Sequence, residues 1–202
     1  MFRRWEFAVV AVAVTCLLAA CNTQAAPLAE LKIGAPAPDW SGVIGIDDKE
    51  HGLADYKEAK VVVMVFTCNH CPVAIAYQDR LVALQKDYQK KGVQLIAVNV
   101  NNIPADRLEP MKVRAKEKGF NFPYLYDPTQ KMGYDYGARV TPHVFVLDKD
   151  RKIAYVGAVD DNNNPKKAEK HYLREALDAL LAGQKPAPAE TRPRGCTVKY
   201  DR

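Results

Sequence analysis

The stretch Val61-Val62-Val63-Met64-Val65-Phe66-Thr67-Cys68-Asn69-His70-Cys71-Pro72 decides the fold of this chain. Six bulky apolar residues in a row, without polar alternation, predict a strand that is buried on both faces. From Pro72 onward, apolar residues recur at helical spacing as far as Tyr88, and Gly92 supplies a stop. A strand, two cysteines and a helix in this order place Cys68 at a helix N-terminus. There, unpaired amides and the helix dipole stabilise a thiolate.

Length and charge limit what the rest of the chain can be. With 202 residues and 48% hydrophobic content, the chain can build one full core but not two comfortable domains. Its formal net charge is +5, but lysines and arginines are interspersed with acids and form no block of like charges. Such a surface is typical of a solvated domain and argues against a nucleic-acid partner.

The first twenty residues resemble a lipoprotein signal peptide. Arg3 and Arg4 precede an apolar segment at residues 7–20 that is too short for an ordinary membrane span. The following Leu18-Ala19-Ala20-Cys21 resembles a bacterial lipobox and implies lipidation of Cys21; ordinary cleavage a few residues later is the alternative. Residues 21–33 would then be a tether. We expect a protein anchored by lipid to a membrane, on the periplasmic face of the bacterial cell envelope, where disulfides can form.

The remaining chain alternates predicted strands and helices around the opening stretch. Strands are expected at 93–100, 122–126, 144–147 and 153–156. Helices are expected at 104–118, after a turn at 127–129 as far as about Tyr136, and from Pro165 onward. A hairpin near residues 43–53 precedes them, with His51 exposed in its turn region. This order predicts an α/β protein with a thioredoxin-like fold, in which helices flank a central mixed sheet and an N-terminal β-hairpin is added. The domain is expected over residues 34–183, and a flexible Pro/Ala-rich arm with a cysteine-containing tail over 184–202.

Cys68 and Cys71 indicate dithiol–disulfide exchange. The first sulfur is expected to be exposed and activated, and the second is close enough to form a redox-active Cys68–Cys71 disulfide, with no other cofactor. A CxxC pair can also be half of a zinc site, but no second CxxC or nearby histidine pair completes four ligands, so no metal is expected.

Two further residues are candidates for the same chemistry. His70, between the cysteines, could favour the Cys68 thiolate and raise the reduction potential, or it could simply point to solvent. Cys196 could fold back on Cys68 or Cys71 as a third thiol, or it could pack as a small apolar residue. Packing is the commoner fate of a lone cysteine, and we expect it by a narrow margin.

Four motifs together resemble one known family. They are residues 66–72, Phe122-Pro123-Tyr124-Leu125-Tyr126-Asp127, Tyr136-Gly137 ahead of Thr141-Pro142, and Gly195-Cys196-Thr197-Val198-Lys199-Tyr200. They resemble the peroxiredoxin-like thioredoxin family, within the redoxin/AhpC-TSA superfamily, over about residues 34–200. The resemblance implies a thioredoxin fold and a thiol redox role. It also implies a cis-proline loop at Thr141-Pro142, where the Thr141 backbone would dock an extended peptide.

The chain departs from its relatives at several positions. Many relatives carry a cysteine immediately before Thr-Pro, whereas this chain has Val140. Val61 and Val65 stand where true peroxidases of the superfamily carry proline and a hydroxyl residue, which argues against peroxide chemistry. Val62 stands where thioredoxin keeps a buried aspartate, and Ala74 stands where some membrane-anchored relatives place a glutamate. The proton acceptor for Cys71 is therefore not identified by the sequence.

The sequence thus predicts an extracytoplasmic thiol–disulfide oxidoreductase that acts on protein thiols and disulfides. In this interpretation Cys68 exchanges with the substrate, Cys71 resolves, His70 tunes the thiolate and Thr141-Pro142 docks the partner. One alternative is a Cu(I)-binding or metal-delivery module that uses Cys68, Cys71 and a histidine such as His143, because soft thiolates and imidazole suit Cu(I). A thiol peroxidase is the other.

Overall fold

The computed structural model describes residues 27–201. The expected signal peptide at residues 1–20 and the lipidation site Cys21 lie outside the described residues. Within residues 27–201, no helix combines the length and the apolar character that crossing a membrane requires.

A seven-stranded mixed sheet forms the centre of the molecule, in the order β2-β1-β5-β4-β3-β7-β8. Its strands are β1 (Val43–Gly45), β2 (Glu50–His51), β3 (Val61–Phe66), β4 (Val93–Asn99), β5 (Tyr124–Tyr126), β7 (His143–Leu147) and β8 (Ile153–Gly157). β3 runs parallel to β4 and antiparallel to β7, and the N-terminal hairpin β1–β2 joins the sheet through β5. The predicted mixed sheet with an added N-terminal hairpin is confirmed.

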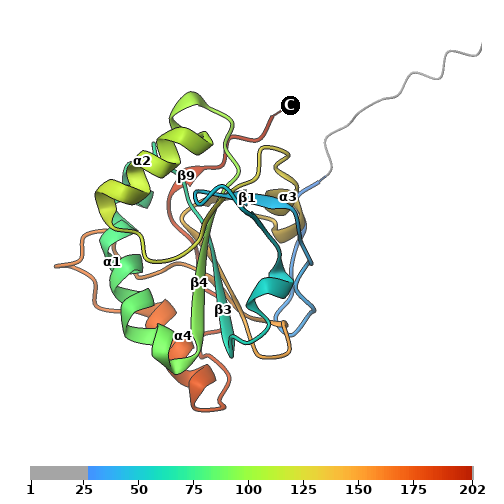
Figure 1. Ribbon diagram of the computed structural model, residues 1–202. Coiled ribbons are helices and arrows are strands. Elements are labelled where there is room, and N and C mark those ends of the chain that lie inside the picture. The colour runs from blue at the N-terminus through green and yellow to red at the C-terminus, as the bar shows by residue number, and fades with distance from the viewer. Residues whose placement is uncertain (1–26, 202) are drawn as a thin grey trace, which may run out of the picture.

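A second sheet has only two strands, β6 (Val140–Thr141) and β9 (Cys196–Thr197). The helices are α1 (Pro72–Tyr88), α2 (Leu108–Lys118), α3 (Lys131–Tyr136) and α4 (Tyr172–Leu181), with 3₁₀ turns η1 (Leu53–Tyr56), η2 (Gln89–Lys91) and η3 (Pro104–Asp106). α1, α2 and α4 lie on one side of the large sheet and α3 on the other (Figure 1). This is the three-layer arrangement of a thioredoxin-like fold.

β3 carries the two cores of the molecule on its two faces. All six of its residues are buried. Val63 and its alternate neighbours face the core formed with α1, α2 and α4, while Met64 and its alternates face the core formed with Trp40, α3 and η1. Because the parallel strands β3 and β4 end at the same edge of the sheet, the loops that follow them meet there.

The predicted helix from Pro72 to Tyr88 is confirmed as α1, but Cys71 is its N-cap, so Cys68 lies three residues before the cap and not at the helix N-terminus. The last helix begins at Tyr172 instead of Pro165. Arg80 of α1 fixes the loop before this helix: it pairs with the buried Asp160 and donates to the Asn162 carbonyl (2.9 Å).

The two segments expected to be free of the domain are attached to it. In the expected tether, the Ala29 amide donates to the Tyr134 carbonyl (2.9 Å) and Leu31 packs on the core. In the Pro/Ala-rich arm, the Thr191 amide donates to the Val156 carbonyl of β8 (3.0 Å), and the Thr191 hydroxyl accepts from the Ala158 amide (2.9 Å). The prediction of a flexible arm is wrong, because these bonds fix it along β8.

Candidate active site

Three cysteines from distant parts of the chain lie together in one cluster. Cys68 follows β3, Cys71 caps α1, and Cys196 lies on β9, beside the first turn of α1 (Figure 1). Cys71 and Cys196 form a disulfide, with their Cα atoms 5.9 Å apart, and Cys68 is free. The expectation that Cys196 merely packs is therefore wrong. The reason is the β6–β9 pairing, which places Cys196 opposite Thr141, while the Cys71 sulfur lies 3.3 Å from the Thr141 carbonyl.

Cys68 is not the exposed, helix-activated sulfur that the sequence predicts. Its exposed fraction is 0%, and its sulfur lies 3.2 Å from the Thr141 hydroxyl. Burial raises the pKa of the Cys68 thiol, and the charge of Asp106 raises that pKa further, while the Thr141 hydroxyl lowers it. The sulfur at the helix N-terminus is that of Cys71, which accepts from the Ala74 amide (3.5 Å). A Cys71 thiolate would be stabilised there.

His70 is held by a buried acid that sequence reasoning missed. Its Nδ1 lies 2.5 Å from Oδ2 of Asp106, whose side chain is fully buried. Oδ1 of the same carboxylate accepts from the Asn69 amide (2.7 Å). The His70 side chain keeps a quarter of its surface exposed, so it reaches from the buried acid toward solvent.

One signal in the sequence could have identified Asp106. It lies in η3, shortly after β4, and the carboxyl ends of neighbouring parallel strands share one edge of the sheet. Relatives carry an acid on the strand or helix that corresponds to β3 or α1, at the positions of Val62 and Ala74. This chain supplies its acid from the neighbouring loop instead.

The loop between the cysteines is fixed by a buried polar network. The Asn69 side chain donates to the Ala105 carbonyl (2.9 Å) and accepts from the Tyr124 hydroxyl (3.1 Å). The Asn99 side chain donates to the Asp106 carbonyl (3.0 Å) and contacts the same tyrosine. Because each of these groups is buried and paired, the loop and η3 hold each other in one geometry.

The expected docking edge is occupied by the chain itself. The Thr141-Pro142 peptide bond is cis, as the resemblance implied. The Thr141 backbone, however, pairs with Cys196 of β9. Antiparallel pairing with an extended peptide is therefore present at Thr141, but the peptide is the protein's own tail.

His143, which the sequence offered as a possible ligand of a metal site, is buried in the fold. It is buried on β7, and its Nδ1 accepts from the Arg139 amide (3.4 Å). Burial, with a smaller contribution from the Arg139 charge, lowers the pKa of His143 to about 4. The imidazole is therefore neutral at physiological pH.

The metal-ligand set considered from the sequence does not assemble. Cys71 is bonded to Cys196 and the Nδ1 of His143 is engaged with the backbone, so this pair cannot join Cys68 around an ion. Among the described residues, the group that could hold a metal is Cys68, His70 and Asp106, whose ligand atoms lie within 4.8 Å of one another. In the structure, His70 and Asp106 use those atoms to bind each other.

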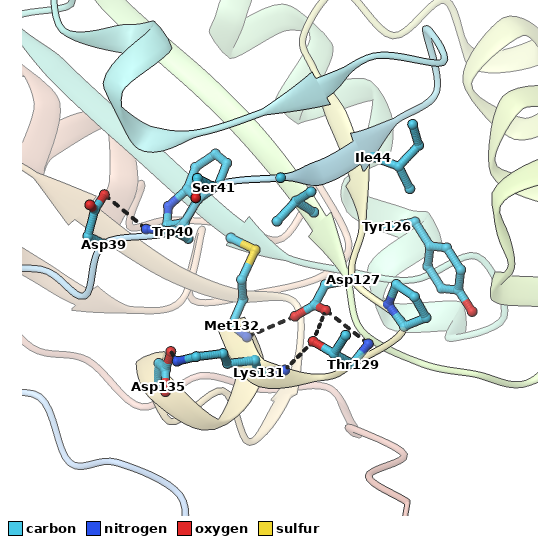
Figure 2. A pocket seen from close by; sticks show the side chains of 13 residues that line it. Asp39, Trp40, Ser41, Ile44, Tyr126, Asp127, Thr129, Lys131, Met132 and Asp135 are labelled. Atoms are coloured by element: carbon cyan, nitrogen blue, oxygen red, sulfur yellow. Dashed lines mark hydrogen bonds and ion pairs between the residues drawn. The ribbon is translucent and has the colours of Figure 1, made fainter.

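A pocket of about 420 Å³ lies on the other side of the sheet, and its lining residues include no cysteine. Trp40 and Met132 line it, together with polar groups of the segment between β5 and α3 (Figure 2). The Asp127 carboxylate there accepts from the amides of Thr129 (3.0 Å) and Met132 (2.8 Å). Asp127, part of one motif behind the resemblance, therefore organises the start of α3.

A family model described as Redoxin matches residues 32–172. The chain belongs to the Redoxin family. The resemblance drawn from the four motifs is thereby confirmed at the level of the superfamily. Redoxin membership and the mixed sheet agree with a thioredoxin-like architecture.

Curated relatives have two kinds of names. The thiol-disulfide oxidoreductase ResA of Geobacillus thermodenitrificans is 30% identical over 123 residues, 60% of this chain and 66% of the relative. Peroxiredoxin-2 of Macaca fascicularis is 33% identical over 135 residues, 62% of each chain. The matched region thus spans slightly less than two thirds of these relatives.

Solved structures match over more of their length. An uncharacterized conserved protein from Geobacillus kaustophilus is 38% identical with a TM-score of 0.79, covering 85% of this chain and 94% of that one. A hypothetical protein from Sinorhizobium meliloti 1021 is 28% identical with a TM-score of 0.80, covering 86% and 97%. The fold therefore extends over nearly the whole of both neighbours.

Proposed function

We propose that this protein is an extracytoplasmic thiol–disulfide oxidoreductase that acts on protein thiols and disulfides. One observation carries the proposal: a free thiol, Cys68, lies in the same cluster as the Cys71–Cys196 disulfide. A thiol packed beside a disulfide is the arrangement that thiol–disulfide exchange requires. Similarity to a protein named as a thiol-disulfide oxidoreductase supports the same reaction.

The proposed exchange uses Cys68 first and Cys71 second. In the reduced protein, the Cys68 thiolate attacks one sulfur of a substrate disulfide, forms a mixed disulfide and releases one substrate thiolate. The Cys71 thiolate then attacks the Cys68 sulfur, which forms a Cys68–Cys71 disulfide and releases the second substrate thiolate. The reverse sequence oxidises a substrate dithiol, and the cysteines themselves carry the electrons.

His70 is proposed to handle the proton of Cys68. Because burial raises the pKa of this thiol, its thiolate forms at neutral pH with the help of a nearby base. The His70 imidazole is oriented by Asp106 and partly exposed, so it can pass a proton between the buried sulfur and solvent. Asp106 is in this scheme a positioning residue.

Docking and location complete the proposal. A protein substrate that pairs with Thr141 has to displace Cys196 and Thr197, which are held there by a two-residue antiparallel ladder. The lipobox-like sequence ending in Cys21 supports attachment to a membrane on the periplasmic face of the cell envelope. The donor or acceptor that completes the cycle is proposed only as a protein thiol or disulfide.

Insulin reduction by dithiothreitol tests the activity. The detergent-solubilised full-length protein is compared with Cys68→Ser and with Val113→Ser, a surface control far more exposed than any cysteine of the cluster. We expect turnover in the wild type and the control, and none in Cys68→Ser. A wild type that is silent with insulin but binds Cu(I) stoichiometrically would overturn the exchange function in favour of metal binding.

Location needs a separate measurement. We expect the full-length protein in the membrane fraction with a lipidated Cys21, and Cys21→Ser in the soluble periplasmic fraction. Recovery of the wild type from the cytoplasm would contradict the proposed location while leaving the exchange chemistry untouched.

A thiol peroxidase is the second candidate, because a hydroxyl does lie beside the reactive thiol. Val65 stands where peroxidases of the superfamily carry a hydroxyl residue, so this chain has no hydroxyl at that position. The Oγ1 of Thr141, however, lies 3.2 Å from the Cys68 sulfur. Peroxide consumption coupled to a thiol reductant measures this activity. Peroxide turnover that exceeds insulin reduction and disappears in Thr141→Val would favour the peroxidase.

A further inference from the structure

The tail that carries Cys196 is fixed by contacts that do not involve its sulfur. The Lys199 amide donates to the Asn101 side chain (2.7 Å), and its carbonyl accepts from the Gln130 side chain (2.9 Å). Val198 is buried in the core, and the Tyr200 hydroxyl donates to the Ala138 carbonyl (2.7 Å). These contacts hold Cys196 next to Cys71 whether or not the disulfide is formed, so the two sulfurs meet at a high effective concentration.

The three cysteine residues differ in their access to solvent. Cys68 and Cys71 are fully buried, whereas Cys196 is partly exposed. An open groove of about 350 Å³ lies near the cysteine cluster: its lining includes Val73, which packs against the cluster, and Arg194, two residues before Cys196. An external thiol can therefore approach this disulfide from the side of Cys196.

We propose that Cys196 is a third catalytic thiol, which accepts the oxidation from the Cys68–Cys71 pair and so completes a three-cysteine relay; this rests on the proposed function. After the substrate has been reduced, the Cys196 thiolate attacks the Cys71 sulfur. The Cys71–Cys196 bond forms, the Cys68–Cys71 bond breaks, and Cys68 leaves as a thiolate. Proton return from His70 to Cys68 follows. The net transfer is two electrons from Cys71 and Cys196 to the substrate disulfide.

In this relay the substrate is reduced at Cys68, whereas the protein itself is reduced again at Cys196; we call this second step recharging. A dithiol reductant recharges the protein: its first thiolate attacks Cys196, which breaks the bond to Cys71. Cys71 leaves as a thiolate at the N-terminus of α1, where the Ala74 amide points at its sulfur. The second thiol of the reductant then attacks the mixed disulfide and releases Cys196. The state seen in the structure, with Cys68 free and Cys71 bonded to Cys196, is the end state of the oxidising half of this cycle.

Peptide mapping after a single oxidation tests the relay. The reduced full-length protein receives one equivalent of the aromatic disulfide 4,4′-dithiodipyridine, is quenched with acid at increasing times, alkylated and cut with trypsin. Cleavage after Lys60, Arg80, Arg194 and Lys199 places Cys68 and Cys71 on one peptide and Cys196 on another. We expect an internal Cys68–Cys71 disulfide that rises and decays, and a final cross-link between the two peptides with Cys68 alkylated.

Matched variants separate this relay from the proposed function. Cys196→Ser should stop at the Cys68–Cys71 disulfide, with single-turnover reduction of the reagent within twofold of the wild type and steady-state recharging by a dithiol slowed at least tenfold. Thr197→Val, the neighbouring exposed change on β9, should retain the wild-type pattern. Thermal melts of reduced Cys196→Ser and Cys196→Ala control for misfolding. If misfolding caused the loss of recharging, both variants would melt at a lower temperature than the reduced wild type.

Three results would overturn parts of the argument in distinguishable ways. A wild type that ends as Cys68–Cys71 with Cys196 alkylated would overturn the relay and leave the oxidoreductase intact. Unchanged recharging in Cys196→Ser would do the same. A Cys68→Ser variant that reacts as fast as the wild type would instead overturn the proposed function, because exchange would then begin elsewhere.

Discussion

The loop that carries Cys68 and the tail that carries Cys196 reach the same point of the molecule by different means. The loop extends from β3, whose residues are buried in both cores, and a buried network around Asn69 and Asp106 fixes it. The tail has a two-residue strand, and side-chain amides such as that of Gln130 hold its backbone. The loop is therefore part of the cooperative core, whereas the tail depends on a few individual contacts.

This difference has a consequence for how the site can change. Truncating the buried strand that carries the loop should destabilise the whole domain, because the loop backbone continues directly from β3. Altering the tail should change the position of one cysteine while the domain stays folded.

The largest effect is expected in the core beneath the loop. Phe66, the last residue of β3, has an exposed fraction of 0% and packs between Tyr136 and Phe145. Phe66→Ala should lower the free energy of unfolding by about 3–5 kcal/mol, measured by urea denaturation. Val198→Ala, a smaller truncation in the tail, should cost about 1.5 kcal/mol for two buried methyl groups. Equal losses at the two sites would contradict the contrast.

A smaller effect should appear on acidification at His143, next to the proline loop. The folded protein holds the pKa of His143 at about 4, below the unfolded value near 6.5, so the folded state binds fewer protons. The stability contribution is fully present above pH 6.5 and is lost as the pH falls toward 4, with a total of about 3 kcal/mol.

His143→Leu isolates this contribution. The wild type should lose free energy of unfolding relative to His143→Leu between pH 6.5 and 4, since all other titrations are common to both proteins. His171→Leu, a change at a half-exposed histidine, serves as the control and should follow the wild type. A constant difference between wild type and His143→Leu across this pH range would exclude His143 as an acid-sensitive position.

The same contrast explains which parts of the molecule were predictable from the sequence. β3, α1 and the β7–β8 hairpin follow from local hydrophobic patterns, because each buries a continuous apolar face. The α4 start was not predictable in this way: the local pattern favours a start at Pro165, but Arg80 from α1 binds the preceding 160–163 segment and α4 begins only at Tyr172. Contacts between distant segments leave no periodic signal in either partner.

The residues of the candidate site likewise fall into those that local sequence motifs reveal and those that only contacts between distant segments bring together. Cys68 and Cys71 were found by motif and spacing and Thr141-Pro142 through the family resemblance, and each lies at the cluster. Asp106 was missed because its segment carries no motif, and only its place after the neighbouring parallel strand β4 points to the site. The partner of Cys71 was missed because it is chosen by the β6–β9 register, which places a cysteine 125 residues away against it.

Asp106→Asn should affect the chemistry more than the fold. Removal of the negative charge lowers the pKa of Cys68 toward its usual range, so the pH profile of Cys68 alkylation in the reduced protein should shift to lower pH. At the same time His70 loses its charged partner, and exchange with a substrate disulfide should slow by about 10–100-fold. The opposite signs distinguish a positioning role from simple structural damage.

Two comparisons sharpen this test. His70→Ala should slow exchange to a similar extent with no further loss in the double variant, because both changes disable one pair. Asp135→Asn, at a carboxylate that pairs with Lys131 on the other side of the sheet, should leave both measurements at wild-type values. Additive losses in the His70 and Asp106 double variant would show that the two residues act independently.

The smallest effect is expected from loosening the tail. Asn101→Ala removes the acceptor of the Lys199 amide and should cost about 1 kcal/mol of stability, the typical value for one hydrogen bond. Because Cys196 is then held less firmly against Cys71, formation of the Cys71–Cys196 disulfide should slow several-fold in the alkylation time course, while formation of Cys68–Cys71 stays unchanged. Asn121→Ala, which removes a hydrogen bond to the Val82 carbonyl and touches no part of the tail, is the control. If Asn101→Ala slowed both disulfides equally, the tail would belong to the same cooperative unit as the loop, and the contrast between the two regions would not hold.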